Sequence, residues 1–317
     1  MLLVGHTAIL RKDTRMRFRL NRSTAIAILV FGFIVLWAYY SSSLPTVSPQ
    51  PPRTGQVSPQ PTTIAPPGPS TRAVPNGNRN LLLGNPSGAV HDPAQPNNYL
   101  IERPQYVLSY NRDRGIPNWV SWQLAQRDIG DVQRSNTFVP DTTLPRGWYR
   151  VTTDDYTGSG YDRGHIIPSA DRSATPEDNQ ATFIMTNIVP QAPDNNRGTW
   201  EQLESFSRSL VAKGYVLYII AGGDGTITTI AKGKVAVPRY TWKIIVVMPK
   251  GESDITADTP VIAVRVPNTL GTDLGDWAQY RVSVADIEAA TGYTFFTNLP
   301  PDVQRALKSG IDPVPTN

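Results

Sequence analysis

The sequence predicts an α+β domain with a largely antiparallel sheet. Short runs rich in β-branched and aromatic residues recur between residues 105 and 266, and each is bounded by Gly, Pro, Asn or Asp, as strands usually are. Segments in which apolar residues have helical spacing are fewer. A regular alternation of strands and helices, which would indicate a parallel sheet, is absent from the sequence.

The strand-like runs outside the centre of the chain occupy residues 105–110, 118–124, 148–152, 215–221, 230–237, 242–248 and 261–266. The clearest helix is predicted over residues 198–213, because apolar residues recur there at spacings of three and four. Ser283, with Asp286 three residues on, forms a typical capping pair and predicts a helix over residues 283–291. A further helix is predicted over residues 301–310.

Residues 24–40 contain no charged side chain, follow a basic segment, and end in Trp37, Tyr39 and Tyr40. This pattern predicts a membrane segment whose basic flank, residues 1–23, stays in the cytoplasm. Two interpretations stay open, an uncleaved anchor or a signal-peptide core that is cut near residues 41–43. Either interpretation predicts export, with the protein membrane-anchored outside the cytoplasm in the first case and secreted or periplasmic in the second.

Residues 41–80 form a predicted linker. Ten of the 29 prolines lie between Pro45 and Pro75, and Val-Ser-Pro-Gln-Pro occurs at residues 47–51 and again at 57–61. Such a composition buries too little apolar surface to offset the entropy of ordering the chain, so an extended spacer is expected. The folded domain is predicted over residues 81–317.

The net charge of +4 suggests an acidic partner, but its distribution removes that argument. Six basic residues and one acidic residue lie within residues 1–43, which leaves 24 basic and 25 acidic residues in the remainder. A polyanion would therefore have to be held by a local cluster of side chains. The sequence has no cysteine, which excludes disulfides, thiolate zinc sites and a cysteine nucleophile.

The chemistry is expected around one of only three histidines, His6, His91 and His165. Because His6 precedes the predicted membrane segment, two remain as candidates for proton transfer near neutral pH. His165 follows a polar, glycine-rich turn and is predicted to begin the first of two strands, residues 165–167 and 182–190. With the helix from residue 198, these strands form a strand–loop–strand–helix unit.

Three motifs in this unit resemble the DNA/RNA non-specific endonucleases of the ββα-metal group. They are Asp-Arg-Gly-His at residues 162–165, Asn-Ile-Val-Pro-Gln at 187–191 and Asn-Arg-Gly-Thr-Trp-Glu-Gln-Leu-Glu at 196–204. The first motif alone would be weak, but the order and spacing of all three make the resemblance specific. It implies the ββα-metal nuclease fold, with a largely antiparallel central sheet and flanking helices.

The resemblance further implies a phosphodiesterase site with one metal ion. His165 would act as the general base on the water that attacks phosphorus. Asn196 would be the protein's direct ligand to one Mg²⁺, with Mn²⁺ as the alternative ion, and waters and phosphate oxygens would complete the coordination. The ion would stabilise charge on the leaving 3′ oxygen.

The same resemblance assigns supporting roles to four more residues. Glu204 would orient the waters of the metal ion, Arg163 and Arg208 would hold phosphate oxygens, and Asn187 would position the site. In addition, Asp162 would hold the geometry of the loop. The implied activity is a Mg²⁺-dependent, sequence- and sugar-non-specific endonuclease that hydrolyses DNA and RNA to 5′-phosphate ends. Its partners would be these nucleic acids and, through residues 24–40, a membrane.

Several residues allow simpler interpretations. Asn195 could replace Asn196 as the metal ligand, although the eight-residue spacing to Glu204 favours Asn196. Glu204 and Arg208 are four residues apart and could form an exposed ion pair on a helix. Trp200 is expected in the core rather than as a platform for stacking bases, and His91 is expected to be structural or at the surface.

Two other functions stay in consideration. One is a catalytically inactive, membrane-tethered protein that captures nucleic acid on the same fold. The other is a different hydrolase built on Ser169 and His165, although nothing near Ser169 resembles a nucleophile elbow. Cleavage of nucleic acid, or binding without cleavage, separates the first alternative from the nuclease.

Overall fold

The computed structural model describes residues 77–249, 251–252, 254–271 and 274–311. The predicted basic segment, the membrane segment and nearly all of the predicted linker therefore lie outside the described residues. No helix within the described ranges is long and apolar enough to cross a membrane. All described residues belong to one compact unit.

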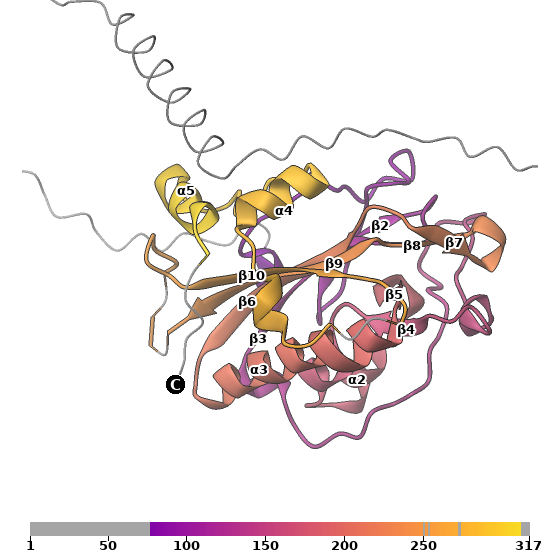
Figure 1. Ribbon diagram of the computed structural model, residues 1–317, viewed down its shortest axis with the longest axis horizontal. Coiled ribbons are helices and arrows are strands. Elements are labelled where there is room, and N and C mark those ends of the chain that lie inside the picture. Colours follow the sequence, from indigo (N-terminus) through magenta and orange to yellow (C-terminus); the bar gives the residue numbers. More distant parts are fainter. Residues whose placement is uncertain (1–76, 250, 253, 272–273, 312–317) are drawn as a thin grey trace, which may run out of the picture. The chain divides into compact units, whose positions relative to one another are not determined.

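A six-stranded antiparallel sheet forms the centre of this unit, with the strand order β1-β2-β3-β6-β9-β10 (Figure 1). Its strands are β1 (Tyr99–Glu102), β2 (Val107–Asn111), β3 (Ile116–Leu124), β6 (Val216–Asp224), β9 (Tyr240–Met248) and β10 (Val261–Pro267). All nine residues of β3 are buried, because the sheet is covered on both faces.

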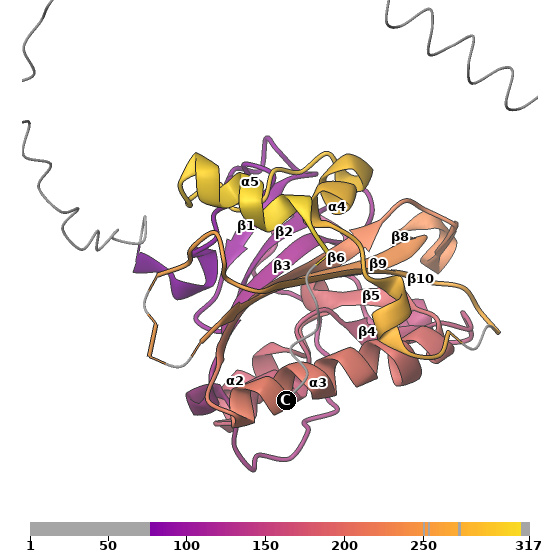
Figure 2. The ribbon, with the colours of Figure 1, turned by 60° about the vertical axis from the view of Figure 1, so that its left-hand side comes forward.

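Side-chain alternation along the strands divides the interior into two cores. On one face, Trp122 of β3 and Ile245 of β9 pack in the larger core, together with residues of α3 (Trp200–Ala212). On the other face, Trp119 and Trp242 pack against α4 (Val284–Thr291) and α5 (Pro301–Ser309). Figures 1 and 2 show the sheet between these helical layers, with α2 (Pro176–Ala181) on the same side as α3.

The unit that positions the candidate site lies on the α3 side of the sheet. Strand β4 (Asp162–His165) pairs antiparallel with β5 (Ile188–Gln191), so that His165 lies opposite Ile188. A π-helical turn (Asn195–Thr199) then leads directly into α3. The remaining strands are β7 (Thr228–Ile230) and β8 (Val235–Val237), which pair as a hairpin. Short 3-10 helices occupy Arg79–Leu81, Gln126–Asp128, Thr153–Tyr156, Ser169–Arg172, Met185–Asn187, Ala231–Gly233 and Trp277–Tyr280.

The predicted fold class is confirmed, with a largely antiparallel central sheet and flanking helices. The predicted helices over residues 198–213, 283–291 and 301–310 correspond to α3, α4 and α5, and Ser283 caps α4 by accepting a hydrogen bond from the Asp286 amide. Most strand predictions also correspond to observed strands.

Four strand predictions were wrong in place or extent. Residues 148–152 form no strand, and Arg150 instead donates to the carbonyls of Asp141 and Leu144. Residues 230–237 are not one strand, because a 3-10 turn divides them between β7 and β8. His165 ends a strand instead of beginning one, and only the last part of residues 182–190 belongs to β5.

Candidate active site

Asp162 joins the two halves of the strand–strand–helix unit. Its carboxylate accepts a hydrogen bond from Asn196 Nδ2 at 2.9 Å. The same carboxylate forms a bidentate pair with Arg197, with distances of 2.8 Å to Nε and 2.6 Å to Nη2. The first residue of β4 is thereby tied to the turn that precedes α3. Asp162 was expected to hold the geometry of the loop, and in the structure its partner in the second half of the unit is Asn196.

His165, at the end of β4, is only 6% exposed. Its ring lies between those of Phe138 and Phe183, with centroid distances of 5.3 and 4.7 Å. Its Nε2 atom is buried and has no hydrogen-bond partner among the described residues. Burial, together with the positive charge of Arg134, lowers the pKa of His165 to about 3. The imidazole is therefore neutral near pH 7 and can accept a proton.

Two guanidinium groups lie over the aromatic rings that flank His165. Arg163 Cζ is 5.0 Å from the centroid of Phe138, and Arg134 Cζ is 5.0 Å from the centroid of Phe183. Arg134 also donates to Ser169 Oγ at 3.0 Å, so its position is fixed from a second side. Both cations stand where an anionic group next to His165 would be attracted.

Arg134 was not found by sequence reasoning. It lies in an irregular segment between the 3-10 helices Gln126–Asp128 and Thr153–Tyr156, without a motif or a periodic pattern around it. Its nearness to His165 comes only from the fold. A lone arginine among polar residues is a weak signal, and nothing in the sequence distinguishes it from a surface residue.

The two neighbouring asparagines have different surroundings. Asn195 is buried and donates from Nδ2 to Thr241 Oγ1 at 3.0 Å and to the carbonyl of Pro267 at 3.1 Å. Asn196 is half-buried, and no described residue donates a hydrogen bond to its Oδ1. A free amide oxygen is what a metal ion would need, so the geometry favours Asn196 over Asn195. The eight-residue spacing to Glu204 does not by itself place the two side chains on one helix face, because the π-helical turn interrupts the regular helical step.

Glu204 does not pair with Arg208, so the interpretation of these residues as an exposed ion pair was wrong. Glu204 is 12% exposed, and its Oε1 lies 3.8 Å from Nζ of Lys243, a residue of β9. Arg208 donates to Asp171 Oδ1 at 3.2 Å and to Ser205 Oγ at 3.0 Å. Lys243 has a sequence signal, since it is a single charge within the apolar strand 240–248. Asp171 has none.

Asn187 and Gly164 hold the backbone around His165. Asn187 is fully buried, accepts a hydrogen bond from the Ile167 amide at 3.0 Å, and donates to the carbonyls of Ile167 and Thr182. A Cβ atom on Gly164 would overlap the Gln191 side chain and lie 2.6 Å from its Cβ. The structure therefore places Asn187 beneath the site and away from solvent, and it gives Gly164 a steric reason to be glycine.

Residues 83–302 match the family model of the DNA/RNA non-specific endonucleases. The chain belongs to this family. It is 51% identical over 247 residues to a protein named Nuclease from Nostoc sp., covering 77% of this chain and 90% of that protein. It is 33% identical to Nuclease C1 of Cunninghamella echinulata, covering 71% of this chain and 90% of the relative.

Comparison with a solved structure supports the same family assignment at the level of the fold. The nuclease matches a chain in the crystal structure of the EndoG/EndoGI complex with a TM-score of 0.59 and 25% sequence identity, covering 70% of this chain and 92% of the other. Human mitochondrial endonuclease G is 31% identical over 214 residues, which are 63% of this chain and 70% of that protein. The nuclease is therefore a hydrolase that acts on nucleic acid, and a non-catalytic function is not favoured.

The oxygen donors of the site fit a hydrated divalent cation. Asn196 offers an amide oxygen and Glu204 a carboxylate, and Mg²⁺ prefers such oxygen ligands together with retained waters. Within the described ranges, no three His, Cys, Asp or Glu side chains converge as metal ligands. A cation in this nuclease would thus be held mainly by Asn196, by waters and by the substrate.

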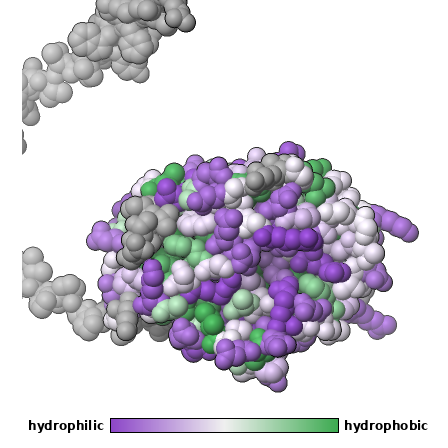
Figure 3. Space-filling view, turned by 60° about the horizontal axis from the view of Figure 1, so that its bottom comes forward, coloured by the Kyte–Doolittle hydropathy of each residue, from purple (hydrophilic) through white to green (hydrophobic). Residues whose placement is uncertain are grey.

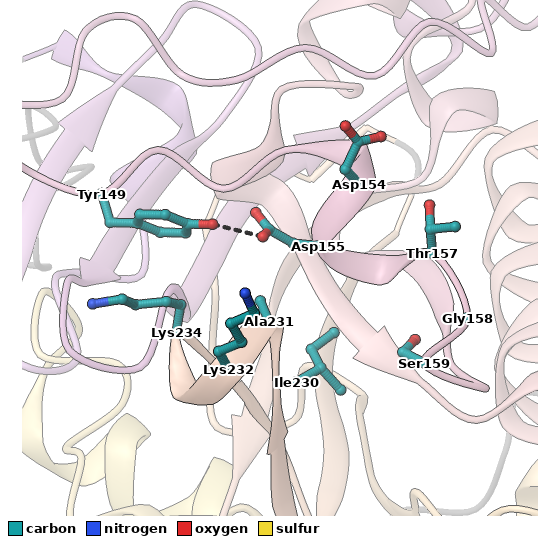
Figure 4. Close-up of a pocket in the computed structure, with 10 residues that line it drawn as sticks. All are labelled: Tyr149, Asp154, Asp155, Thr157, Gly158, Ser159, Ile230, Ala231, Lys232 and Lys234. Carbon is teal, nitrogen blue, oxygen red and sulfur yellow. Dashed lines mark hydrogen bonds between the residues drawn. The ribbon is translucent and has the colours of Figure 1, made fainter.

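One cavity elsewhere on the described surface does not include the predicted site residues. A cavity of about 610 Å³ lies between the 3-10 helix Thr153–Tyr156 and the β7–β8 hairpin. Figure 4 shows Tyr149 donating to Asp155 across its edge, and none of the predicted site residues lines it. On the side that carries α2 and α3, polar side chains gather in a band, with small apolar patches between them (Figure 3).

The remaining alternatives concern single residues of the nuclease. Ser169 Oγ accepts a hydrogen bond from Arg134, and no hydrogen bond joins it to His165 among the described residues, which argues against a serine hydrolase. Trp200 is 1% exposed and belongs to the core, as expected. His91 contacts the Leu100 carbonyl and Tyr99 Oη in an exposed loop, which agrees with a structural role.

Proposed function

We propose that this nuclease is a Mg²⁺-dependent, sequence- and sugar-non-specific endonuclease that cuts DNA and RNA to 5′-phosphate ends. The observation that carries the proposal is the neutral His165, whose buried Nε2 has no described partner and whose ring is flanked by Arg134 and Arg163. The buried Nε2 has no described partner and is free to accept a proton from water, and the two cations would attract the anionic phosphodiester and stabilise the charge that develops on it.

In this proposal each site residue has a separate role in the reaction. His165 Nε2 accepts the proton of the attacking water, while Arg163 and Arg134 hold the phosphate oxygens. Asn187 fixes the backbone that follows His165. Asn196 holds Mg²⁺, and when bound this ion supplies positive charge that stabilises the leaving oxygen.

Glu204 and Arg208 complete the proposed site from α3. Glu204 orients waters near Asn196, as a carboxylate beside a hydrated cation commonly does. Arg208 is held by Asp171 and Ser205, so it contributes a fixed positive charge behind the phosphate. Its pairing makes it less free to follow the substrate than Arg163, which is exposed.

Plasmid nicking and RNA digestion with and without EDTA test the proposal. Wild-type protein should cut both nucleic acids only with the divalent ion present, and His165→Ala should lose about 10²–10⁴-fold in rate. His91→Ala is the matched control, since His91 lies outside the site, and it should keep full activity. Cutting in EDTA, or full activity of His165→Ala, would overturn the proposal, as would binding without cleavage.

We also propose that the enzyme acts outside the cytoplasm, either anchored to a membrane through residues 24–40 or released after cleavage. The uncharged segment with its basic flank supports this. Membrane fractionation, with N-terminal sequencing of the mature protein, tests it. An intact N-terminus in the soluble cytoplasmic fraction would contradict export.

A further inference from the structure

We propose that Lys243 is a positioning residue for the nuclease reaction, because its buried ammonium group holds the Glu204 carboxylate in place next to the site. This inference rests on the proposed function, in which Glu204 orients waters of the bound cation. Lys243 belongs to β9, on the opposite side of the core from the exposed surface of α3. It touches neither the proposed metal position nor any expected part of the substrate.

The position of Lys243 is unusual for a lysine. Its side chain is 1% exposed and lies in the central sheet, with Ala221 and Val264 as its neighbours on the adjacent strands. Its Nζ atom is 4.2 Å from the ring centroid of Trp200 and 5.8 Å from that of Trp122. Lysine is almost never fully buried without a partner, and an aliphatic residue would fill this space at lower cost.

The partner that explains this burial is Glu204. Its Oε1 lies 3.8 Å from Lys243 Nζ, the one ion pair of Glu204 among the described residues. Asp171, the other nearby carboxylate, is already held by Trp122 Nε1 at 3.1 Å and by Arg208 Nη1 at 3.2 Å. Arg208 is therefore committed to Asp171, and the charge on Glu204 is left to Lys243.

The electrostatics of the pair agree with this geometry. Burial raises the pKa of Glu204, and Lys243 is the strongest of the groups that oppose this shift. Asp171 and Glu201 act in the same direction as burial, whereas Arg208 supports Lys243. Burial in turn lowers the pKa of Lys243, and Glu204 opposes that shift. Each group thus favours the charged form of the other and opposes the effect of burial on the pKa of its partner.

A buried ion pair is weak evidence for stability, since an apolar pair of similar size often stabilises a core as well or better. The pair also costs desolvation of two charges. The position of the Lys243–Glu204 pair beside the site explains its presence better than a contribution to stability does. Trp200, one turn before Glu204 on α3, covers the ammonium group, so the lysine also fixes the helix from which Glu204 projects.

A double-mutant cycle with Lys243→Met and Glu204→Gln tests the inference on the full-length enzyme. Lys243→Met should lower kcat by about 10- to 100-fold while KM for DNA stays nearly constant, because residues behind a metal site act on the chemistry and not on substrate binding. In the Glu204→Gln background the same change should have an effect of less than about twofold, since the group that Lys243 positions is already lost.

Lys308→Met is the matched control. Lys308 also pairs with a glutamate, Glu288, at 2.8 Å, but on the α4–α5 side of the sheet. This variant should keep the wild-type kcat. If Lys243→Met does not fold, Lys243→Gln replaces it in the same double-mutant cycle, because glutamine is also unbranched and has a polar end. Failure of both variants to fold would overturn the inference in favour of a purely structural role.

The outcomes separate the two proposals. A wild-type kcat for folded Lys243→Met overturns the inference, and so does an equal loss in both backgrounds. An inactive wild-type protein overturns the proposed function itself. An active wild type, a fall in kcat without a change in KM, and no further loss in Glu204→Gln together support Lys243 as a positioning residue.

Discussion

Asp162 accepts a hydrogen bond from the side-chain amide of Asn196, and Oδ2 and Nδ2 are 2.9 Å apart although 34 residues separate the two positions in the sequence. Because the NH₂ group of Asn196 is occupied by this bond, its Oδ1 is turned away from Asp162. The amide can then offer only its oxygen to a cation. Asp162 thus determines which atom of Asn196 is available.

Asp162→Ala should therefore weaken the binding of Mg²⁺ by about 10- to 100-fold, as loss of a group that orients a metal ligand commonly does. The measurement is a Mg²⁺ titration of nuclease activity, supported by calorimetric binding of Mn²⁺. Asp113→Ala is the control, since Asp113 pairs with the neighbouring Arg112 at an exposed position. Unchanged half-saturation by Mg²⁺ in Asp162→Ala would show that Asn196 needs no orientation.

The buried His165 should make the folded protein sensitive to acid. Its pKa is about 3 in the folded state, compared with an ordinary value of 6.5, so the unfolded chain binds the proton more readily between these pH values. The contribution to stability is present above pH 6.5 and is lost as the pH falls towards 3. Urea unfolding should show a loss of up to roughly 1.4 kcal/mol for each pH unit in this window.

His165→Asn removes the titrating group and provides the comparison. The difference between the pH profiles of the two proteins should show this slope. Parallel profiles between pH 3 and 6.5 would contradict a neutral, buried imidazole.

The acidic limb of the activity profile should come from Glu204 and not from His165. Burial raises the pKa of Glu204 to about 7, whereas His165 is already neutral well below that pH. If the ionised carboxylate is needed, kcat/KM should be half-maximal near pH 7 and should level off only above that pH, where the carboxyl group is fully ionised. Glu204→Gln should be slower and should lack this rise. A limb that persists in Glu204→Gln would assign the titration to another group.

Gly164→Ala should destabilise the β4–β5 pair, because the added methyl group would overlap Gln191. Overpacking of this kind costs about 1–3 kcal/mol, which urea unfolding can measure. Gly198→Ala is the matched control, since no atom beyond its own stretch of backbone lies within 4 Å of the position its Cβ would take, and its φ is not positive. That change should be neutral or slightly stabilising. Equal effects of the two substitutions would contradict the steric role of Gly164.

The elements and motifs that could be predicted from the sequence are those that a short segment encodes by itself. Helix α3 was predicted because its apolar residues recur at helical spacing, and strand β3 because its residues are rich in β-branched and aromatic side chains. The three motifs placed His165 and Asn196 on one unit. Strand β4 was misplaced because residues 162–165 are polar and contain a glycine, so their pairing with β5 has no hydrophobic signature. Aromatic composition alone suggested a strand at residues 148–152.

The contacts between distant segments could not be predicted in the same way. Arg134 reaches the ring of Phe183 from an irregular segment, and Lys243 reaches Glu204 through the core. Neither pair has a sequence spacing that reveals it. The helical spacing of Glu204 and Arg208 allowed an ion pair between them, yet each residue has its partner on another element.

The π-helical turn at Asn195–Thr199 has a consequence for the length of this segment. Asn195 faces the sheet and Asn196 faces the site, so identical neighbours serve different purposes. Deleting one residue within the turn would restore α-helical stepping and rotate the following residues by about 100°. The composition would hardly change, yet the Asn196 amide, the proposed ligand of the cation, would be displaced from its place beside Asp162. Residue count in this turn is therefore as critical as residue identity, and loop grafts from other nucleases need to preserve it.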